Sequence, residues 1–212
     1  MTTNYIFPSD DILEAGIDES NRGGLIGEVV SACVVLKKPT TDYDIEIYNQ
    51  IKDSKKLTKK KRQFLSKYIK ENALTYGIAN ASLSEINDIN ILKATLKAMH
   101  RATDIAYKKN KFDKILIDGP YYNGYIPSGE ESEIIPHICI NKGDSLYTCI
   151  AAASILAKEQ HTQNIIDLVN ENKELEKYDL LNNQGYGTKK HLDAIKQYGI
   201  TKWHRKNYKC CQ

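Results

Sequence analysis

The sequence contains no run of apolar residues long enough to cross a lipid bilayer, and its first residues do not place an apolar segment after a charged one. We therefore expect no membrane span and no secretory signal. The five cysteines are scattered and odd in number, which argues against a disulfide framework. We expect the adjacent residues Cys210 and Cys211 to be exposed free thiols. These absences predict a protein of a reducing, cytoplasmic compartment.

The sequence also lacks internal repeats, low-complexity tracts and the closely spaced cysteines or histidines of local metal motifs. Its 212 residues suit one domain that can bury a full core, and we expect a monomer. With 41% hydrophobic and 27% charged residues, the composition is that of a globular protein. The net charge of +3 permits a partner that carries phosphates but does not require one.

Two neighbouring carboxylates stand out at the start of the chain. Asp18 and Glu19 end a predicted strand at 12–19, and a glycine-rich connection leads to a second apolar strand at 27–37. Successive residues of a strand point to opposite faces, so the two acids need a strand end or a kink to act together. A hard cation such as Mg²⁺ would relieve their repulsion. The alternative interpretation, which this stretch alone favours, is a solvated turn.

The rest of the chain alternates predicted helices and strands. The first predictions in chain order are a loop at 38–49, a helix from N-cap Thr58 to about 71 with Leu65, Tyr68 and Ile69 inward, and a strand at 73–82 antiparallel to the second strand. After these come a helix at 84–109 carrying Leu92, Leu96, Met99 and Ile105, a strand at 114–118, a loop at 121–133, and an edge strand with Pro136 at 134–140. The last predicted elements are an alanine-rich helix at 149–170, an exposed segment at 171–184, and a helix from N-cap Thr188 to Gly199.

Four acids stand at the ends of these elements, and a basic cluster precedes one helix. The acids are Asp18, Glu19, Asp118 and Asp144. Together they suit a two-metal site, in which paired ions activate water and stabilise the leaving oxygen of a phosphodiester. The basic cluster includes Lys55 and Lys56. It is compatible with a solvated helix start and with a surface that contacts phosphates.

Several segments in order resemble the motifs of the ribonuclease HII (type 2 ribonuclease H) family. They are residues 16–27, 53–57, 116–119, 142–158, 185–192 and 204–205. The resemblance extends from about residue 13 to about residue 208. It implies a ribonuclease H-like α/β fold, with a five-stranded mixed sheet flanked by helices. It also implies a single domain over residues 1–212, with a catalytic core at about 12–165 and a small C-terminal helical, substrate-binding region at about 166–212.

The resemblance further implies an endonuclease that depends on Mg²⁺ or Mn²⁺. Such an enzyme hydrolyses the RNA strand of RNA–DNA hybrids and incises on the 5′ side of ribonucleotides in duplex DNA, leaving 3′-hydroxyl and 5′-phosphate ends. Its roles are the removal of ribonucleotides and of primers from DNA. The 2′-hydroxyl is the group by which a protein tells RNA from DNA at one position.

The resemblance assigns roles to individual residues. The metal and catalytic residues are Asp18, Glu19, Asp118 and Asp144. The residues that bind nucleic acid are Asn21, Arg22 and Gly23 at the 2′-hydroxyl, Tyr186 on the neighbouring sugar, and Lys55 and Lys56 at phosphates. From composition alone, Tyr186 could equally be a core residue, because the chain has 14 tyrosines.

The sequence departs from the family pattern at three places. Asn21 replaces a glycine, Gly24 replaces a proline, and residues 161–162 are His-Thr where the family has Arg-Asp. Asn tolerates left-handed backbone angles better than most residues, so we expect the turn to survive. On this basis Asn21→Gly should leave activity unchanged or raise it.

Two other functions are compatible with such a scaffold. One is a module that binds RNA–DNA hybrids without cutting them. Four clustered carboxylates argue against it, because without a metal they would repel phosphates. The other is a nuclease that acts on DNA junctions, and the segment that would contact the 2′-hydroxyl argues against that.

Overall fold

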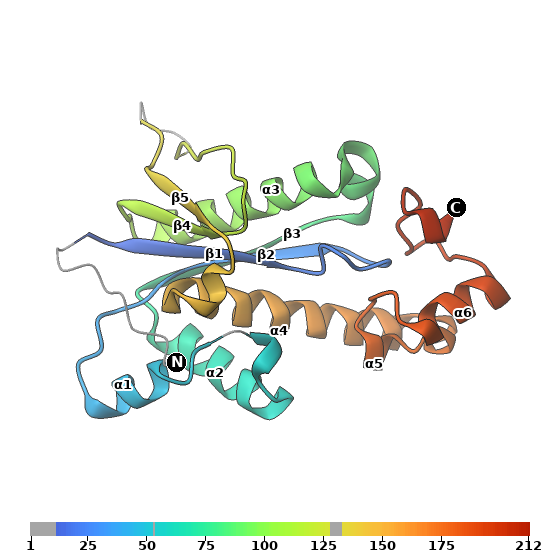
Figure 1. The fold of residues 1–212 in the computed structure, drawn as a ribbon, viewed down its shortest axis with the longest axis horizontal. Coiled ribbons are helices and arrows are strands. Elements are labelled where there is room, and N and C mark those ends of the chain that lie inside the picture. The colour runs from blue at the N-terminus through green and yellow to red at the C-terminus, as the bar shows by residue number, and fades with distance from the viewer. Residues whose placement is uncertain (1–11, 53, 128–132) are drawn as a thin grey trace.

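A mixed sheet of five strands forms the centre of the computed structural model, which describes residues 12–52, 54–127 and 133–212 (Figure 1). The strands are β1 (Glu14–Ser20), β2 (Val29–Val35), β3 (Thr75–Ala81), β4 (Lys114–Asp118) and β5 (His137–Ile140). Their spatial order is β3-β2-β1-β4-β5; β1, β2 and β3 are antiparallel, whereas β4 runs parallel to β1 and to β5. The predicted five-stranded mixed sheet and its edge strand β5 are confirmed.

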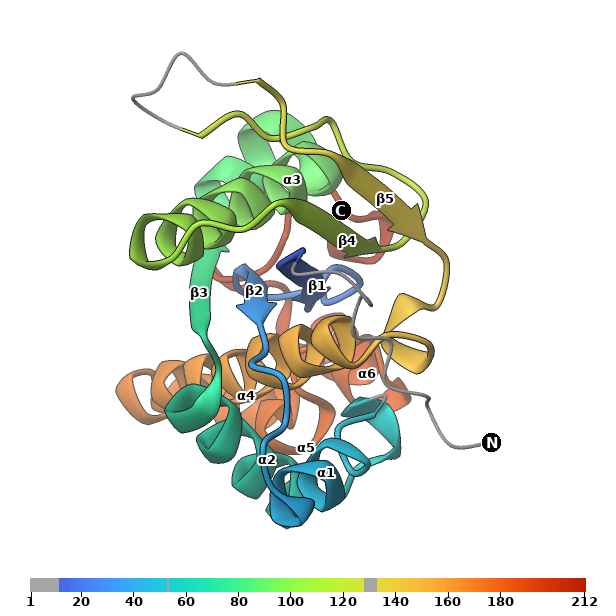
Figure 2. The ribbon, with the colours of Figure 1, turned by 90° about the vertical axis from the view of Figure 1, so that its left-hand side faces the viewer.

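Helices cover both faces of this sheet. Helix α3 lies on one face and α4 on the other, and α1 and α2 lie beyond α4 (Figure 2). The helices are α1 (Asp42–Tyr48), α2 (Lys59–Asn72), α3 (Leu83–Lys109), α4 (Thr148–Glu171), α5 (Leu180–Asn183) and α6 (Lys189–Tyr198). Short 3-10 turns add η1 (Ser54–Lys56), η2 (Gly143–Ser145), η3 (Lys173–Tyr178) and η4 (Lys209–Cys211).

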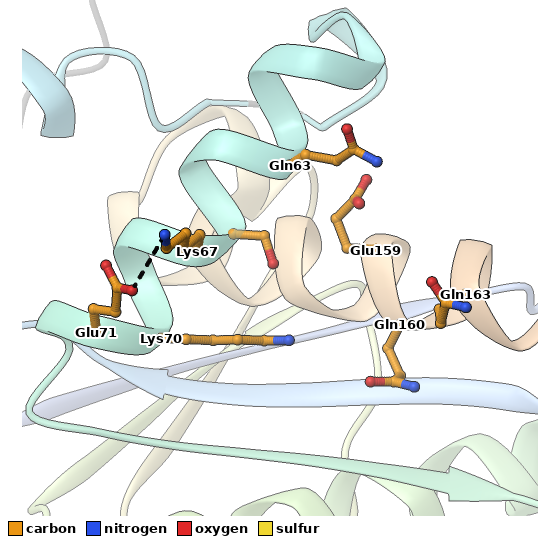
Figure 3. A pocket seen from close by; sticks show the side chains of 8 residues that line it. Gln63, Lys67, Lys70, Glu71, Glu159, Gln160 and Gln163 are labelled. Carbon is orange, nitrogen blue, oxygen red and sulfur yellow. Dashed lines mark ion pairs between the residues drawn. The ribbon is translucent and has the colours of Figure 1, made fainter.

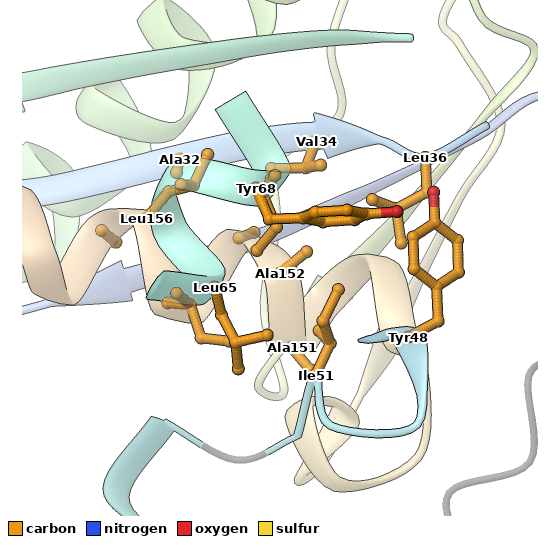
Figure 4. Packing of buried hydrophobic residues seen from close by; sticks show 14 of the residues in the cluster. Ala32, Val34, Leu36, Tyr48, Ile51, Leu65, Tyr68, Ala151, Ala152 and Leu156 are labelled. Carbon is orange, nitrogen blue, oxygen red and sulfur yellow. The ribbon is translucent and has the colours of Figure 1, made fainter. Parts of the chain in front are cut away.

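Strand β2 is buried on both faces because helices cover both sides of the sheet. Ala32 and Val34 pack into the cluster made with α2 and α4, and Cys33 and Val35 pack into the cluster made with α3. This alternation follows the two-residue period of a strand. The first of these clusters includes Tyr68 of α2 and the alanines of α4 (Figure 4).

Helix α4 lies in close contact with β1 at Gly16. A side chain at Gly16 would place its Cβ 2.2 Å from the backbone carbon of Cys149, so only glycine fits there. The small residues Ala151, Ala152 and Ala153 are fully buried behind it. This contact brings the polar residues of α4 to the end of β1, where the candidate site lies.

The predicted helix starts are confirmed where a capping residue marks them. The Thr58 hydroxyl accepts the Lys61 N–H at the start of α2, and the Thr188 hydroxyl accepts the His191 N–H at the start of α6. In α3 the prediction is only partly right. Leu96 and Met99 are buried, whereas Leu92 and Ile105 are exposed. Asn90, with φ of 69° and ψ of 164°, interrupts the helix two residues before Leu92.

The predictions of a loop at 38–49 and of an exposed Cys211 are wrong. The predicted loop at 38–49 contains α1, which starts with a capping box: the Asp44 N–H donates to the Thr41 hydroxyl, and the Thr41 N–H donates to the Asp44 carboxylate. Ile47 and Tyr48 then anchor this helix in the core. Cys211, predicted to be exposed, is buried, whereas Cys210 is exposed.

The prediction that the segment 171–184 is exposed holds for its charged residues Glu171, Lys173, Glu174, Glu176 and Lys177, but its apolar residues contribute to a second core. Leu175, Tyr178 and Leu180 are almost fully buried, and they pack with Leu25 and Ile26 from the β1–β2 connection. The charged residues between them mask this apolar spacing in the sequence. The C-terminal region is therefore packed against the connection that follows the two N-terminal acids.

Residues 1–11 of the predicted domain, Asp53 of the motif at 53–57 and residues 128–132 of the predicted loop at 121–133 lie outside the described residues. Across the three described ranges, no helix combines the length and the hydropathy that a membrane crossing requires.

Candidate active site

The ends of two parallel strands bring three of the predicted acids together. Ile17 of β1 is paired with Ile117 of β4, so Asp18 and Asp118 follow on neighbouring strands at the same edge. Asp18, Glu19 and Asp118 line one cavity of about 260 Å³. Other residues that line it are Ser20, Asn21, Arg22, Gly23, Ser54, Lys55, Ser154, Lys158 and Tyr186.

The fourth acid lies next to this cavity without lining it. Asp144 is buried in η2 and accepts a hydrogen bond of 3.3 Å from the Ser145 hydroxyl. The preceding residue, Gly143, donates its N–H to Oδ1 of Asp118 at 2.6 Å. Among the described residues, no group of three or more acidic, histidine or cysteine side chains is arranged so that it could hold a metal ion. The convergence of all four acids on one site therefore stays a prediction.

The acids that share the cavity are electrostatically unfavourable on their own. Burial raises the pKa of Asp18 well above its usual value, and the charges of Glu19 and Asp118 raise it further. Burial also raises the pKa of Glu19, while the charge of Arg22, whose guanidinium lies 3.7 Å away, works against this. A divalent cation would lower these pKa values, and carboxylate oxygens are the ligands that Mg²⁺ and Mn²⁺ prefer. The donor set thus fits a hard cation.

Helix α4 and η1 contribute polar residues that the sequence analysis did not single out. Ser154 lies within hydrogen-bond distance of Ser54 at 3.0 Å between the two hydroxyl oxygens, and its hydroxyl lowers the pKa of Asp18. Lys158 follows Ser154 by one helical turn and lines the same cavity. Polar residues four apart in an alanine-rich helix share one face, and this spacing could have revealed them.

The predicted recognition residues lie beside the acids. Asn21 has the expected left-handed backbone, with φ of 69°. Its N–H donates to the Tyr186 hydroxyl at 3.3 Å, although the two residues are 165 positions apart. Lys55 lines the cavity, whereas Lys56, its neighbour in η1, does not. The structure thus brings Asn21, Arg22, Gly23 and Tyr186 together on one side of the cavity.

Arg205 holds the backbone of the β1–β2 connection. Its side chain is fully buried and donates only to oxygen atoms. Nε donates to the carbonyl oxygen of Gly27 at 3.0 Å. Nη1 donates to the carbonyl oxygens of Arg22 at 3.0 Å and Gly24 at 2.7 Å and to the Tyr208 hydroxyl at 3.2 Å. Nη2 donates to the carbonyl oxygens of Asn21 at 2.8 Å and Glu28 at 3.2 Å. Sequence reasoning placed residues 204–205 in a family motif but gave Arg205 no role at the site.

Two buried histidines support the backbone of Tyr186. The Thr201 N–H donates to Nδ1 of His204, whose Nε2 lies 3.2 Å from Nε2 of His191. Nδ1 of His191 in turn lies 3.0 Å from the Tyr186 carbonyl oxygen. Burial lowers the pKa of His204 to about 4 and also lowers that of His191, so both rings are neutral near pH 7. Two neutral rings can form this chain of hydrogen bonds with one proton each.

Cavity size does not identify the site. A cavity of about 440 Å³ between α2 and α4 is lined by Gln63, Gln160, Gln163, Ser66, Lys67, Lys70, Glu71 and Glu159 (Figure 3). Lys67 and Glu71 form an exposed ion pair of 3.9 Å there. None of the four predicted acids lies in this larger cavity. The smaller cavity at the strand ends is the candidate site because it gathers the carboxylates.

Comparison with known proteins gives the family. The family model of ribonuclease HII matches residues 15–211. Ribonuclease HII of Christiangramia forsetii is 43% identical over 204 residues, which cover 96% of this chain and 93% of that relative.

Solved structures give the same fold. The ribonuclease H2 of Pyrococcus horikoshii OT3 has a TM-score of 0.70 and 24% identity, covering 94% of this chain and 95% of that one. Bst-RNase HIII in complex with Mn²⁺ has a TM-score of 0.71 and 18% identity, covering 94% of this chain and 68% of that one. At these identities the structures show the fold alone, an RNase H-like α/β fold. On its sequence matches, the chain belongs to the ribonuclease HII family and is a ribonuclease H endoribonuclease.

Proposed function

We propose that this chain hydrolyses the RNA strand of RNA–DNA hybrids and incises duplex DNA on the 5′ side of embedded ribonucleotides. The products carry 3′-hydroxyl and 5′-phosphate ends, and the roles are the removal of ribonucleotides and of primers from DNA. The observation that carries this proposal is the shared cavity: Asp18 and Asp118 line it together with Arg22, Gly23 and Tyr186. Its cytoplasmic location and monomeric state stay predictions from the sequence.

Asp18, Glu19, Asp118 and Asp144 are the residues that would hold Mg²⁺ or Mn²⁺. When bound, such ions supply an activated water and stabilise the charge that develops on the leaving oxygen. Backbone N–H groups orient two of these carboxylates. The Glu19 N–H donates to Oδ1 of Asp18 at 2.7 Å, and the Gly143 N–H fixes Asp118. The raised pKa values of Asp18 and Glu19 support a cation here, because its charge would keep both groups ionised.

The remaining residues of the cavity would bind the nucleic acid. The backbone of Asn21, Arg22 and Gly23 would border the 2′-hydroxyl, because backbone groups beside glycine can approach a sugar closely. The Tyr186 ring would contact the neighbouring sugar. Lys55 and Lys56, at the basic end of η1, would contact phosphates.

Cleavage of a duplex with a single ribonucleotide tests the proposal. A labelled DNA duplex with one ribonucleotide is incubated with Mg²⁺, with Mn²⁺, or with EDTA, and the ends of the products are mapped. We expect incision on the 5′ side of the ribonucleotide with either metal and none with EDTA. Binding without incision under all conditions would support the hybrid-binding module instead. Equal cutting of an all-DNA junction would support a junction nuclease.

Replacing Tyr186 should affect the two substrates unequally. Aromatic contacts with nucleotides are worth about 1–3 kcal/mol by alanine substitution, so Tyr186→Ala should lower kcat/KM on a single embedded ribonucleotide by about tenfold or more. A continuous hybrid offers many registers and should lose less. Tyr186→Phe is the matched control, because it keeps the ring and loses only the hydroxyl that accepts the Asn21 N–H. Equal losses on both substrates would mean that Tyr186 serves the fold or general binding.

A further inference from the structure

The side chain of Asn21 is buried inside the β1–β2 connection that Asn21 begins. Asn21 is 1% exposed, and Nδ2 donates to the carbonyl oxygens of Ile26 at 3.0 Å and Glu28 at 2.7 Å. The backbone closes the same turn, because the Gly24 N–H donates to the Asn21 carbonyl oxygen at 3.3 Å. The carboxamide therefore ties the first residue of the β1–β2 connection to its last residues.

Gly24 leaves the space that this carboxamide fills. A Cβ at position 24 would lie 1.7 Å from Oδ1 and 2.7 Å from Cγ of Asn21, and its third neighbour, at 3.2 Å, is Nδ2 of the same residue. Gly24 is not among the glycines with positive φ, so its backbone angles do not require glycine. The need for glycine at this position is steric, and it comes from Asn21.

The hydrogen bonds show which atom of the carboxamide matters. Oδ1 of Asn21 is buried without a hydrogen-bond partner, whereas Nδ2 has two. A buried acceptor without a partner opposes folding, so the donor side of the group is what stabilises this arrangement. An aspartate has nearly the same shape but presents only acceptors when ionised, and it could not replace Asn21.

We propose that Asn21 and Gly24 form an interlocked pair that positions Arg22 and Gly23 for the ribonucleotide. The carboxamide of Asn21 acts as a positioning group, and the absence of a side chain at Gly24 makes room for it. The position of the Tyr186 side chain depends on the same pair, because its hydroxyl accepts the Asn21 N–H. This inference rests on the proposed function. It also reverses the expectation from sequence alone: Asn21→Gly should lower activity, because two hydrogen bonds and a buried group are lost.

A double-mutant cycle at these two positions tests the pair. The wild type, Asn21→Ala, Gly24→Ala and the double variant are compared by thermal unfolding and by kcat/KM on a single embedded ribonucleotide and on a continuous hybrid. Substitutions of two residues in contact typically have non-additive effects. We therefore expect Gly24→Ala alone to lower kcat/KM on the single embedded ribonucleotide by about tenfold or more. In the Asn21→Ala background the same change should cost much less, because the three nearest atoms that the added Cβ would meet are gone.

Two outcomes would overturn the interlock: a Gly24→Ala variant equal to the wild type, or losses that multiply in the double variant. Should Gly24→Ala not fold, Asn21→Asp provides a second measurement. A role in filling space predicts activity near that of the wild type for this variant, whereas the interlock predicts a loss comparable to that of Asn21→Ala. If the wild type itself does not cleave, the proposed function fails, while the melting temperatures of the four proteins still test the interlock.

Discussion

Replacing Asp118 by Asn should lower cleavage of a ribonucleotide-containing duplex by about a thousandfold or more, without lowering the melting temperature. Asparagine keeps the shape of the side chain and an oxygen that can accept the Gly143 N–H. It removes the negative charge that a divalent cation requires, and metal ions contribute several kcal/mol to such reactions. Because the charge of Asp118 raises the pKa values of Asp18 and Glu19, its removal also relieves repulsion in the folded protein.

Single-turnover kinetics with saturating Mg²⁺, combined with substrate binding and thermal unfolding, would measure this. Asp193→Asn is a matched control, because it removes one carboxylate from an exposed ion pair with Lys189 on α6. That variant should match the wild type, since exposed pairs contribute little. Turnover close to that of the wild type in Asp118→Asn would remove Asp118 from the catalytic residues.

Replacing Arg205 by Ala should destabilise the protein and abolish efficient cleavage together. The change leaves the carbonyl oxygens of Asn21, Arg22, Gly24, Gly27 and Glu28 without this donor. Each buried carbonyl oxygen left without a donor costs about 1–3 kcal/mol, so the loss of several lowers the melting temperature of a chain of this size by about 10 °C or more. The β1–β2 connection should then exchange its amide hydrogens faster than β1 itself.

Thermal unfolding and hydrogen exchange of residues 21–28 would measure both effects. Arg205→Lys should recover only part of the stability, because one ammonium group cannot span the acceptors that a guanidinium reaches. Lys206→Ala, which changes the exposed neighbour of Arg205, is the matched control and should behave as the wild type. Unchanged protection of residues 21–28 in Arg205→Ala would contradict the role that we assign to this side chain.

The parts of the fold that could be predicted are those in which local pattern and tertiary packing agree. The strand at 114–118 is apolar from Ile115 to Ile117, and Thr58 and Thr188 cap helices that begin directly after them. The hydrophobic pattern of the sequence does not by itself show that the acids lie beside one another. Their placement depends on β4 joining the sheet next to β1, an arrangement that the order of the predicted elements allowed but did not require.

The parts that could not be predicted depend on backbone groups and on distant packing. The carbonyl acceptors of Arg205 have no signature in the sequence, because every residue carries a carbonyl oxygen. The direction of the Asn21 carboxamide was equally hidden. Helix α1 was missed beside Pro39 although its capping box was present, and the burial of Tyr178 depends on a connection more than a hundred residues away.

The contacts of Arg205 with the β1–β2 connection can form only late in the synthesis of the chain. Chains emerge from the ribosome from the N-terminus and fold as they emerge, at about 5–20 residues per second. Asn21 and Arg205 are 184 positions apart, so the sheet can form well before the guanidinium reaches the β1–β2 connection. A growing chain can therefore carry its carboxylates while the segment beside them is still unsupported. The segment that we propose to contact the ribonucleotide is therefore completed last, after translation has passed residue 205.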